Sequence, residues 1–344
     1  MYTRFLFFIF ILISISSALS SCYHEINLDK YKDEEGKDIL TLNSIITPDS
    51  VIAVSATKTF FFSDKHTESI AVSDLDIQLL INGDNVGLLE YDPSRKLYMS
   101  HIKPNAEDIV EISTVYMNEK VYAKESVPKD VPIENITVKL RGPFSDEFSQ
   151  KYYSFTYEIT FSDNSDEQNY YFFWFNDCRN RKEPWKSTTL GTIDYSHSIV
   201  FQKLKDYMGA SAPSWLMWNY PGLPFSDAGI NGDRHSLTVI EDVMVDNISS
   251  EMIRDFKLFA INKAYYDYIV GNLIYIESID DSPSGMIDLG LADPIRTFSN
   301  IHNGIGVFGC YTLSQKQLDV LPLVFPANGI RQGKNKKEEV KSKK

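Results

Sequence analysis

An alternation of apolar and polar side chains across residues 153–161 constrains the fold more than any other feature of the sequence. Apolar residues stand at positions 153, 155, 157, 159 and 161, with polar residues between them. A period of two places successive side chains on opposite faces of a β-strand, whereas a helix needs a period near 3.6. The pattern therefore predicts a strand with one buried face, and the surrounding fold must supply a β-sheet.

Further strands are predicted after this one. The polar loop Ser162–Gln168 leads into an aromatic run, Tyr170–Phe175, so we expect the two strands to form one long antiparallel hairpin. Later strands are expected at Ser236–Val245 and Val307–Leu313, and the last would close the sheet or barrel. Residues 131–326 are predicted to form an antiparallel β-rich sandwich or barrel.

One helix is expected to interrupt this domain, at about residues 250–270. Its evidence is a set of apolar residues at helical spacing: Met252, Phe256, Phe259, Ala260, Ala264 and Tyr268. Ser249 or Ser250 would cap the N-terminus, since a serine hydroxyl can accept a free backbone N–H. Gly271 would lie just past the C-terminal end.

The preceding residues predict a second, smaller β-domain. Asn82-Gly83 separates two strand-like segments and is typical of a hairpin turn with positive φ. Another alternating strand is expected at 107–116. Such short strands indicate an immunoglobulin-like β-sandwich over residues 38–130, and hence a mainly β chain. Pro128 and Pro132 favour a domain boundary here, because proline has no amide donor for a central strand.

The first residues predict export and lipidation. A short apolar run from Phe5 follows Arg4 and leads to Leu19-Ser20-Ser21-Cys22. This arrangement predicts a lipoprotein signal peptide over residues 1–21, with Cys22 acylated and thereby held in a lipid bilayer. An uncleaved anchor is the alternative, but a run of roughly ten apolar residues falls short of the ~20 needed to span a bilayer. Residues 22–37 are polar and predict a flexible tether.

Charge excludes one class of partner. The chain has a formal net charge of −13, although seven Lys or Arg and two Glu lie in its last fourteen residues. An acidic globule repels nucleic acid, because phosphate binding needs clustered Lys and Arg. The basic segment 327–344 is predicted to be disordered.

No catalytic residue, metal site or cofactor is predicted. Gly304-Ile305-Gly306-Val307-Phe308-Gly309 matches the dinucleotide-binding fingerprint, but a strand-like segment follows where a helix is required. We therefore expect these glycines to permit a tight bend. The six histidines lack zinc-site spacing, and the acidic loop at 163–167 lacks the pattern of a calcium loop. A hydrolase remains one alternative, because Asp227, Asp233 and His235 could meet near one loop.

Four aromatic residues are candidate ligand-binding residues: Trp215, Trp218, Tyr220 and Phe225. Prolines and a glycine interrupt this stretch, so its rings could project from a loop and bind a small ligand or peptide. Alternatively, the rings close one end of the β-domain. Cys178 and Cys310 could form one disulfide in an oxidising compartment, or remain two buried thiols.

Several segments carry a resemblance to a known family. They are Cys22 with its preceding motif, Leu42-Asn43-Ser44-Ile45-Ile46, Val54, Thr57-Lys58-Thr59, Val72-Ser73-Asp74-Leu75-Asp76-Ile77, Val127-Pro128, Val131-Pro132-Ile133, Phe225-Ser226-Asp227, Asn231-Gly232, Phe298-Ser299-Asn300-Ile301 and the glycine-rich hexapeptide at 304–309. On these residues the chain resembles the Bacteroidetes outer-membrane lipoproteins grouped as domain of unknown function 4249. The resemblance covers nearly all of the mature sequence.

The resemblance implies a location and a partner but no chemistry. It implies an outer-membrane lipoprotein, anchored through a palmitate-type acyl group, that works beside a TonB-dependent transporter. We expect the protein to face the cell surface. The periplasmic face is the alternative, because Glu25 is the only acid soon after Cys22. Asp49-Ser50-Val51 is similar to the O-glycosylation triplet of that phylum, which makes Ser50 a candidate site. The expected function is non-enzymatic ligand capture or uptake, with a structural or adhesive, fimbrial-type surface protein as the alternative.

Overall fold

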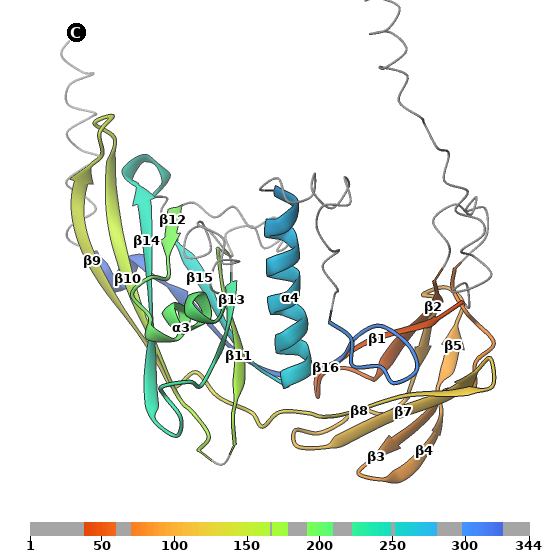
Figure 1. Cartoon of the computed structure of the whole chain (residues 1–344). Coiled ribbons are helices and arrows are strands. Elements are labelled where there is room, and N and C mark those ends of the chain that lie inside the picture. The colour runs from red at the N-terminus through yellow and green to blue at the C-terminus, as the bar shows by residue number, and fades with distance from the viewer. Residues whose placement is uncertain are drawn as a thin grey trace, which may run out of the picture. The chain divides into compact units, whose positions relative to one another are not determined.

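The computed structural model describes residues 38–59, 70–165, 167–177, 191–208, 222–248, 252–280 and 298–325 (Figure 1). Strands dominate these residues, and helices are few. The strands form several sheets that are largely antiparallel, and no sheet closes into a barrel. The predicted fold class, a mainly β chain with sandwich-like packing and one long inserted helix, is therefore confirmed.

The N-terminal sandwich contains eight strands in the described residues. They are β1 (Leu40–Ile46), β2 (Ala53–Lys58), β3 (Gln78–Ile81), β4 (Asp84–Leu88), β5 (Glu90–Asp92), β6 (Leu97–Met99), β7 (Ile109–Tyr116) and β8 (Glu119–Ser126). One sheet has the order β4-β3-β7-β8, and the strands β1-β2-β6-β5 belong to a larger sheet. The predicted Asn82-Gly83 hairpin joins β3 to β4, and both turn residues have positive φ.

The C-terminal domain contains the remaining elements. They are β9 (Asn135–Ser145), β10 (Lys151–Ser162), β11 (Tyr170–Asp177), β12 (Gly191–Asp194), α3 (Ile199–Met208), β13 (Gly222–Ser226), β14 (Arg234–Met244), η3 (Val245–Asn247), β15 (Ile253–Ile261), α4 (Lys263–Asp280), β16 (Phe308–Asp319) and α6 (Leu321–Val324). One sheet has the order β12-β14-β10-β9, and the strands β13-β11-β15-β16 form part of the larger sheet. Aromatic and aliphatic side chains of both sheets form one core between them.

The predicted hairpin between β10 and β11 is wrong, although both strands exist. β10 pairs with β9 and β14, whereas β11 pairs with β13 and β15. Phe161 of β10 and Tyr171 of β11 have ring centroids 5.4 Å apart in the core. The loop between these strands therefore carries the chain from one sheet to the facing sheet. Each strand alternates because its inward face is buried, which the sequence predicted correctly.

The predicted helix at about 250–270 needs correction. Residues 253–261 form β15, and the helix α4 begins only at Lys263. Asn262 caps it, because its Oδ1 accepts the Tyr265 N–H at 3.2 Å. Gly271 lies inside α4 rather than past its end. The second helix, α3, was not predicted from the sequence; it buries one side against the core.

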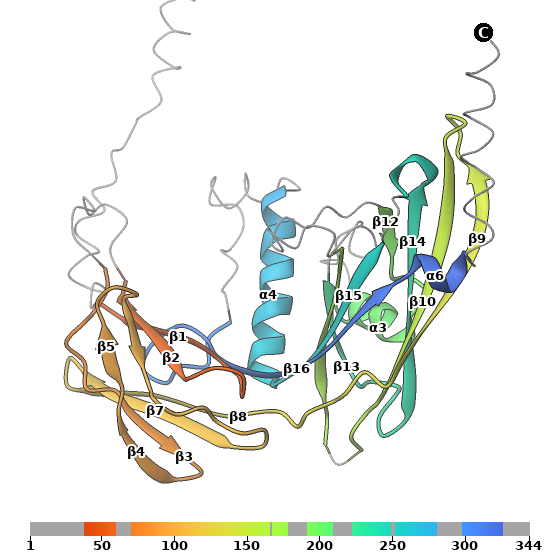
Figure 2. The same ribbon diagram turned by 180° about the vertical axis from the view of Figure 1, so that it is seen from behind.

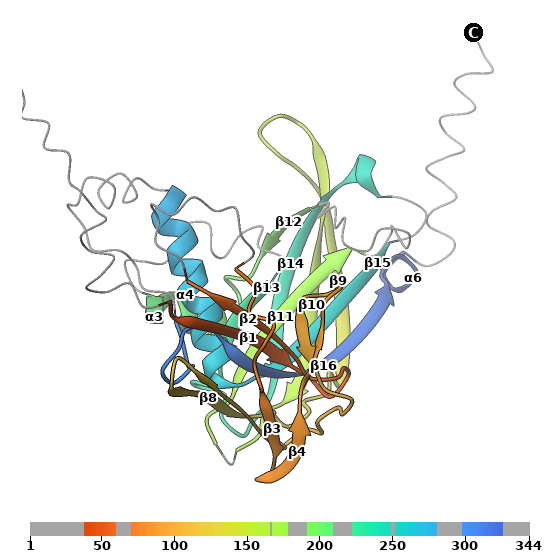
Figure 3. The ribbon, with the colours of Figure 1, turned by 90° about the vertical axis from the view of Figure 1, so that its right-hand side faces the viewer.

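Strand β16 belongs to both domains. It pairs antiparallel with β15 and parallel with β1, so one eight-stranded sheet runs through both domains (Figure 2). Figure 3 shows β16 beside β15 from another side. Its first residues also complete the N-terminal core, where Phe308 and Cys310 are fully buried. The domains are thus joined by hydrogen-bonded backbone as well as by the linker at 127–134.

The expected glycine bend before β16 is confirmed. Gly306 has a φ of +119°, a conformation that residues with a side chain rarely adopt. A Cβ at this position would lie 2.0 Å from the carbonyl oxygen of Leu42. Gly306 therefore permits the close approach of this segment to β1, which is a structural role and not a nucleotide-binding one.

Candidate functional site

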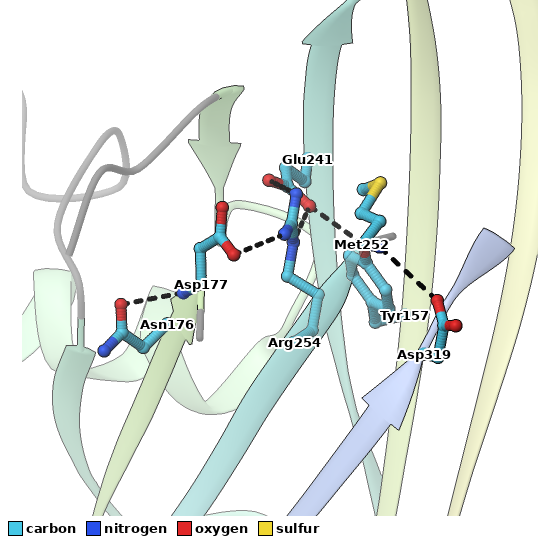
Figure 4. A network of polar contacts seen from close by, with 7 residues as sticks. All are labelled: Tyr157, Asn176, Asp177, Glu241, Met252, Arg254 and Asp319. Atoms are coloured by element: carbon cyan, nitrogen blue, oxygen red, sulfur yellow. Dashed lines mark hydrogen bonds and ion pairs between the residues drawn. The ribbon is translucent and has the colours of Figure 1, made fainter. Parts of the chain in front are cut away.

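A buried ionic cluster joins the two sheets of the C-terminal domain (Figure 4). The Arg254 guanidinium of β15 donates from Nε and Nη2 to the two carboxylate oxygens of Glu241 on β14, at 2.9 and 2.8 Å. Its Nη1 lies 3.3 Å from Oδ1 of Asp177 on β11. The Tyr157 hydroxyl of β10 donates to Glu241 at 2.8 Å. Four strands from both sheets therefore meet at one guanidinium.

The electrostatic interactions in this cluster keep Arg254 charged and the Tyr157 hydroxyl protonated. Burial alone would lower the pKa of Arg254, but the Glu241 carboxylate raises it above its usual value. Burial and the same carboxylate raise the pKa of the Tyr157 hydroxyl well above its normal range. The Arg254 and Glu241 side chains are each only 1% exposed. With its charge held and its atoms out of reach of solvent, the cluster serves to hold the sheets together.

The residues of the hydrolase alternative lie at one end of the C-terminal domain. Backbone bonds connect their loop: Ile230 N–H donates to the Asp227 carbonyl, and Asp233 N–H donates to the Ile230 carbonyl. The Asp227 carboxylate accepts the Asn169 N–H at 2.8 Å. Burial raises the pKa of Asp227, and burial lowers the pKa of His235. Among the described residues, no side-chain hydrogen bond links Asp227, Asp233 and His235 to one another, and the hydrolase alternative stays a prediction.

A nearby acid, Asp163, accepts two hydrogen bonds that stabilise the local structure. Its carboxylate accepts hydrogen bonds from the Tyr171 hydroxyl and from the Gly232 N–H. Burial and the bond to Asp163 raise the pKa of Tyr171. The described residues contain no group of three or more metal-ligating side chains. The Asp163 carboxylate therefore links the end of β10 to β11 and to the turn before β14.

The candidate binding site is a pocket of about 450 Å³ where the linker meets both domains. It is lined by the end of β8, the linker residues 127–129, the loop before β11 and the start of α4. Charged side chains of both signs face it, including Glu107 and Lys129. A pocket of this size is within the range of small-molecule sites.

Glu125 forms a fixed polar contact at this pocket. Its carboxylate accepts a hydrogen bond from Nδ2 of Asn262 and another from Nδ2 of Asn300, each 2.8 Å long. Neither amide can rotate by a half-turn without loss, because its Oδ1 accepts a backbone N–H, from Cys310 and from Phe308 respectively. Both Nδ2 groups must therefore donate, and only an acceptor fits between them.

We expect Glu125→Gln to lower the free energy of unfolding by about 1–3 kcal/mol. The glutamine amide would place a donor against one of the two asparagine donors, which leaves a polar group unsatisfied. Urea denaturation measures the change. Glu107→Gln is the matched control, because Glu107 is an exposed acid that lines the same pocket. Equal stabilities of the two variants would contradict the proposed role of Glu125.

Most of the predicted aromatic binding residues lie outside the described residues, namely Trp215, Trp218 and Tyr220. Phe225 is described, and the prediction is wrong for it. It lies on β13, is 0% exposed, and packs against the rings of Tyr171 and Phe201. Phe225 thus fills the core, as the alternative explanation of this stretch expected for its rings.

The other predicted site residues have separate outcomes. Cys22 and Cys178 lie outside the described residues, as do the predicted signal peptide, tether and basic tail. Cys310 is buried and forms no disulfide within the described residues, and burial raises the pKa of its thiol. Its pairing with Cys178 stays a prediction. Ser50 lies exposed in the turn between β1 and β2, and its glycosylation likewise stays a prediction.

Sequence reasoning missed Arg254, Glu241 and Glu125, although a signal was present. Each occupies an inward position of its strand, two residues from buried apolar neighbours such as Phe256, Val239 or Ala123. A charged residue at a core position requires a buried partner. The partner itself comes from a different strand, which alternation within one strand cannot identify.

These features define the class: a mainly β protein with sandwich-like packing, in which one sheet passes two hydrophobic cores and a pocket lies beside the segment that connects them. Residues 25–317 match the family described as a domain of unknown function, DUF4249, and the chain belongs to that family. No curated protein matches the chain.

A solved structure from Corynebacterium diphtheriae, described as a membrane-anchored protein, shows a limited similarity. The match has 12% sequence identity and a TM-score of 0.20, and it covers 65% of this chain and 55% of that chain. Similarity at this level supports no inference. In the described part of the chain, no helix has the length and apolar character needed to cross a membrane.

Proposed function

We propose that this protein is a non-enzymatic lipoprotein of the outer membrane that captures a small ligand or peptide at the cell surface and works with a TonB-dependent transporter. The observation that carries the proposal is Leu19-Ser20-Ser21-Cys22 behind a short apolar run. Acylation there would tether the folded domains through the polar segment 22–37. The junction pocket supports a binding role, because it offers charged groups of both signs in a concave surface.

Lipidation is tested by labelling cells with radioactive palmitate. We expect the wild-type protein to be labelled and to sediment with outer membranes, and Cys22→Ala to lose both properties, because no other group would carry the acyl chains. Cys178→Ala is the control, since it removes a cysteine of the mature chain and should keep the label. Labelling of the Cys22→Ala protein would contradict the anchor assignment.

Orientation and partner are tested on the same cells. We expect protease added to intact cells to digest the wild-type protein, and a tagged protein in mild detergent to recover a TonB-dependent transporter. Cells carrying a periplasmic marker control for leakage. Recovery of the protein alone under several growth conditions would contradict the uptake role, and protection from protease would place the protein on the periplasmic face.

A further inference from the structure

A second pocket, of about 490 Å³, lies on the outer face of the sheet β4-β3-β7-β8. Along β7, Ile112 and Thr114 are buried on the inner side, so Val115 lies on the outer face. Val115 is 65% exposed, and Leu88, on the edge strand β4, is 59% exposed. Both line the pocket. Apolar side chains that gather on one exposed surface mark a site of interaction.

Charges of opposite sign lie on the two sides of Val115. β8 neighbours β7 on one side, and its Lys120 is the residue paired with Val115 in register. β3 neighbours β7 on the other side, and Asp74 and Asp76 lie on the segment that leads into β3. All three charged side chains are exposed and line the same pocket. Across the strands, the surface therefore changes from acidic through apolar to basic.

These three charges are not neutralised within the described part of the chain, where none of them forms an ion pair or a side-chain hydrogen bond. The Lys120 Nζ instead lies 5.3 Å from the centroid of the Tyr122 ring, which favours one position of the ammonium group. The next charges on the same face differ. Lys124 and Glu111 are paired in register, and their charged atoms are 3.6 Å apart. The charges at the pocket are thus available to a partner.

A surface with this order of charges is complementary to a second copy of itself. Two copies can face one another about a two-fold axis that runs along β7, in the plane between the sheets. Such an axis places each side of one face against the opposite side of the other, so every contact occurs twice. Lys120 of each copy then meets Asp74 and Asp76 of the other copy, while Val115 meets its own counterpart at the axis. A purely cationic or anionic partner would neutralise one side of the pocket and leave the other side unpaired.

The size of the face sets the expected affinity. The sheet has four strands, of four to eight residues in β3 and β7. At about 4.8 Å between strands and 3.4 Å per residue, the face measures roughly 20 Å by 20 Å. Two such faces would bury on the order of 1,000 Å², at the lower end of specific interfaces. The net charge of −13 opposes association, but salt at about 0.15 M screens repulsion beyond about 8 Å. A weak dimer is therefore expected.

We propose that the outer face of β4-β3-β7-β8 binds the same face of a second copy of the chain, which makes the protein a weak two-fold dimer. Lys120 forms ion pairs with Asp74 and Asp76 of the other copy, and the exposed aliphatic side chains pack between them. The inference goes beyond ligand capture and does not depend on it, because association is a property of the purified protein. A lipid anchor would favour the dimer, since copies held in one bilayer have a raised effective concentration.

Sedimentation equilibrium of the mature chain, residues 22–344 with Cys22→Ala, tests the proposal without an acyl chain. We expect a reversible dimer with a dissociation constant on the order of 100 µM. Lys120→Glu makes both sides of the face acidic, and Asp74→Lys with Asp76→Lys makes both sides basic. Each variant alone should associate at least about tenfold more weakly, because like charges meet across the axis. Mixed in equal amounts, the two variants should form a dimer again, since an acidic face then meets a basic one.

Matched controls lie on α3. Lys203→Glu and Asp206→Lys reverse the same types of charge at exposed positions outside this sheet, and they should leave the dissociation constant unchanged. Unchanged urea midpoints show that the variants are folded. The proposal is overturned if the parent protein is monomeric at about 1 mM, which would leave the face to a different partner. It is also overturned if the mixed variants stay monomeric, or if the controls weaken association as much as the variants of the face.

Discussion

Arg254→Met is expected to lower the free energy of unfolding by about 3–5 kcal/mol, because it leaves the Glu241 and Asp177 carboxylates buried without their cation. Methionine fills a similar volume, so the loss would reflect charge and hydrogen bonding rather than a cavity. Urea denaturation followed by tryptophan fluorescence measures it. Removing one of the two unpaired charges with Glu241→Gln in the same variant should recover part of the loss, since an amide oxygen can still accept the Tyr157 hydroxyl.

Arg234→Met is the matched control for this prediction. Arg234 donates to Glu134 at 2.6 Å, a shorter contact than any made by Arg254, but its side chain is 64% exposed. Exposed ion pairs contribute about 0–1 kcal/mol, because water solvates both charges when the pair is broken. Burial, and not the donor–acceptor distance, should therefore decide the difference. Equal losses in the two variants would show that the cluster does not stabilise the domain through buried charge.

Alternation predicted the strands well because it reports a local property, namely which side chains face the core. Tyr157, Ile159 and Phe161 are buried as their spacing requires. The pairing of strands, in contrast, is not determined by the alternation within any one strand. β10 and β11 are consecutive and both alternate, yet they belong to facing sheets. Nothing in their own residues distinguishes pairing side by side from packing face to face.

The error at β15 has a definite physical cause. Met252, Phe256, Ala260 and Ala264 are spaced by four residues, and a spacing of four places side chains on one side of a strand as well as of a helix. Arg254 lies between Met252 and Phe256. It could have distinguished a strand from a helix only if its buried ion-pair partner, Glu241, had been known from the sequence. The helix begins instead at Lys263, after a cap at Asn262.

The candidate sites were less predictable than the fold. Both pockets combine residues from distant segments, such as Glu107 with Lys263, or Asp74 with Lys120. Their charged side chains look like ordinary surface residues in the sequence. Only the parallel pairing of β16 with β1 and the order of the N-terminal strands bring them together.

Gly306→Ala is expected to lower the free energy of unfolding by about 3–5 kcal/mol, through backbone strain and a direct clash. The new Cβ would lie 2.0 Å from the Leu42 carbonyl oxygen and 2.9 Å from Oδ1 of Asn43. Relief requires the segment to move away from β1. Such movement would break the bonds from Leu42 N–H to the Ile305 carbonyl and from Ser44 N–H to the Val307 carbonyl, which are 2.9 and 2.8 Å long.

Gly83→Ala separates the two causes. Gly83 has a φ of +88°, but a Cβ there would meet no atom within 4 Å. Its replacement should therefore cost only the conformational strain, about 1–2 kcal/mol. Hydrogen exchange adds a local measurement: Gly306→Ala should speed exchange at Leu42 and Ser44, and Gly83→Ala should not. If the two variants lose equal stability and exchange alike at β1, close packing at Gly306 does not hold the shared sheet together.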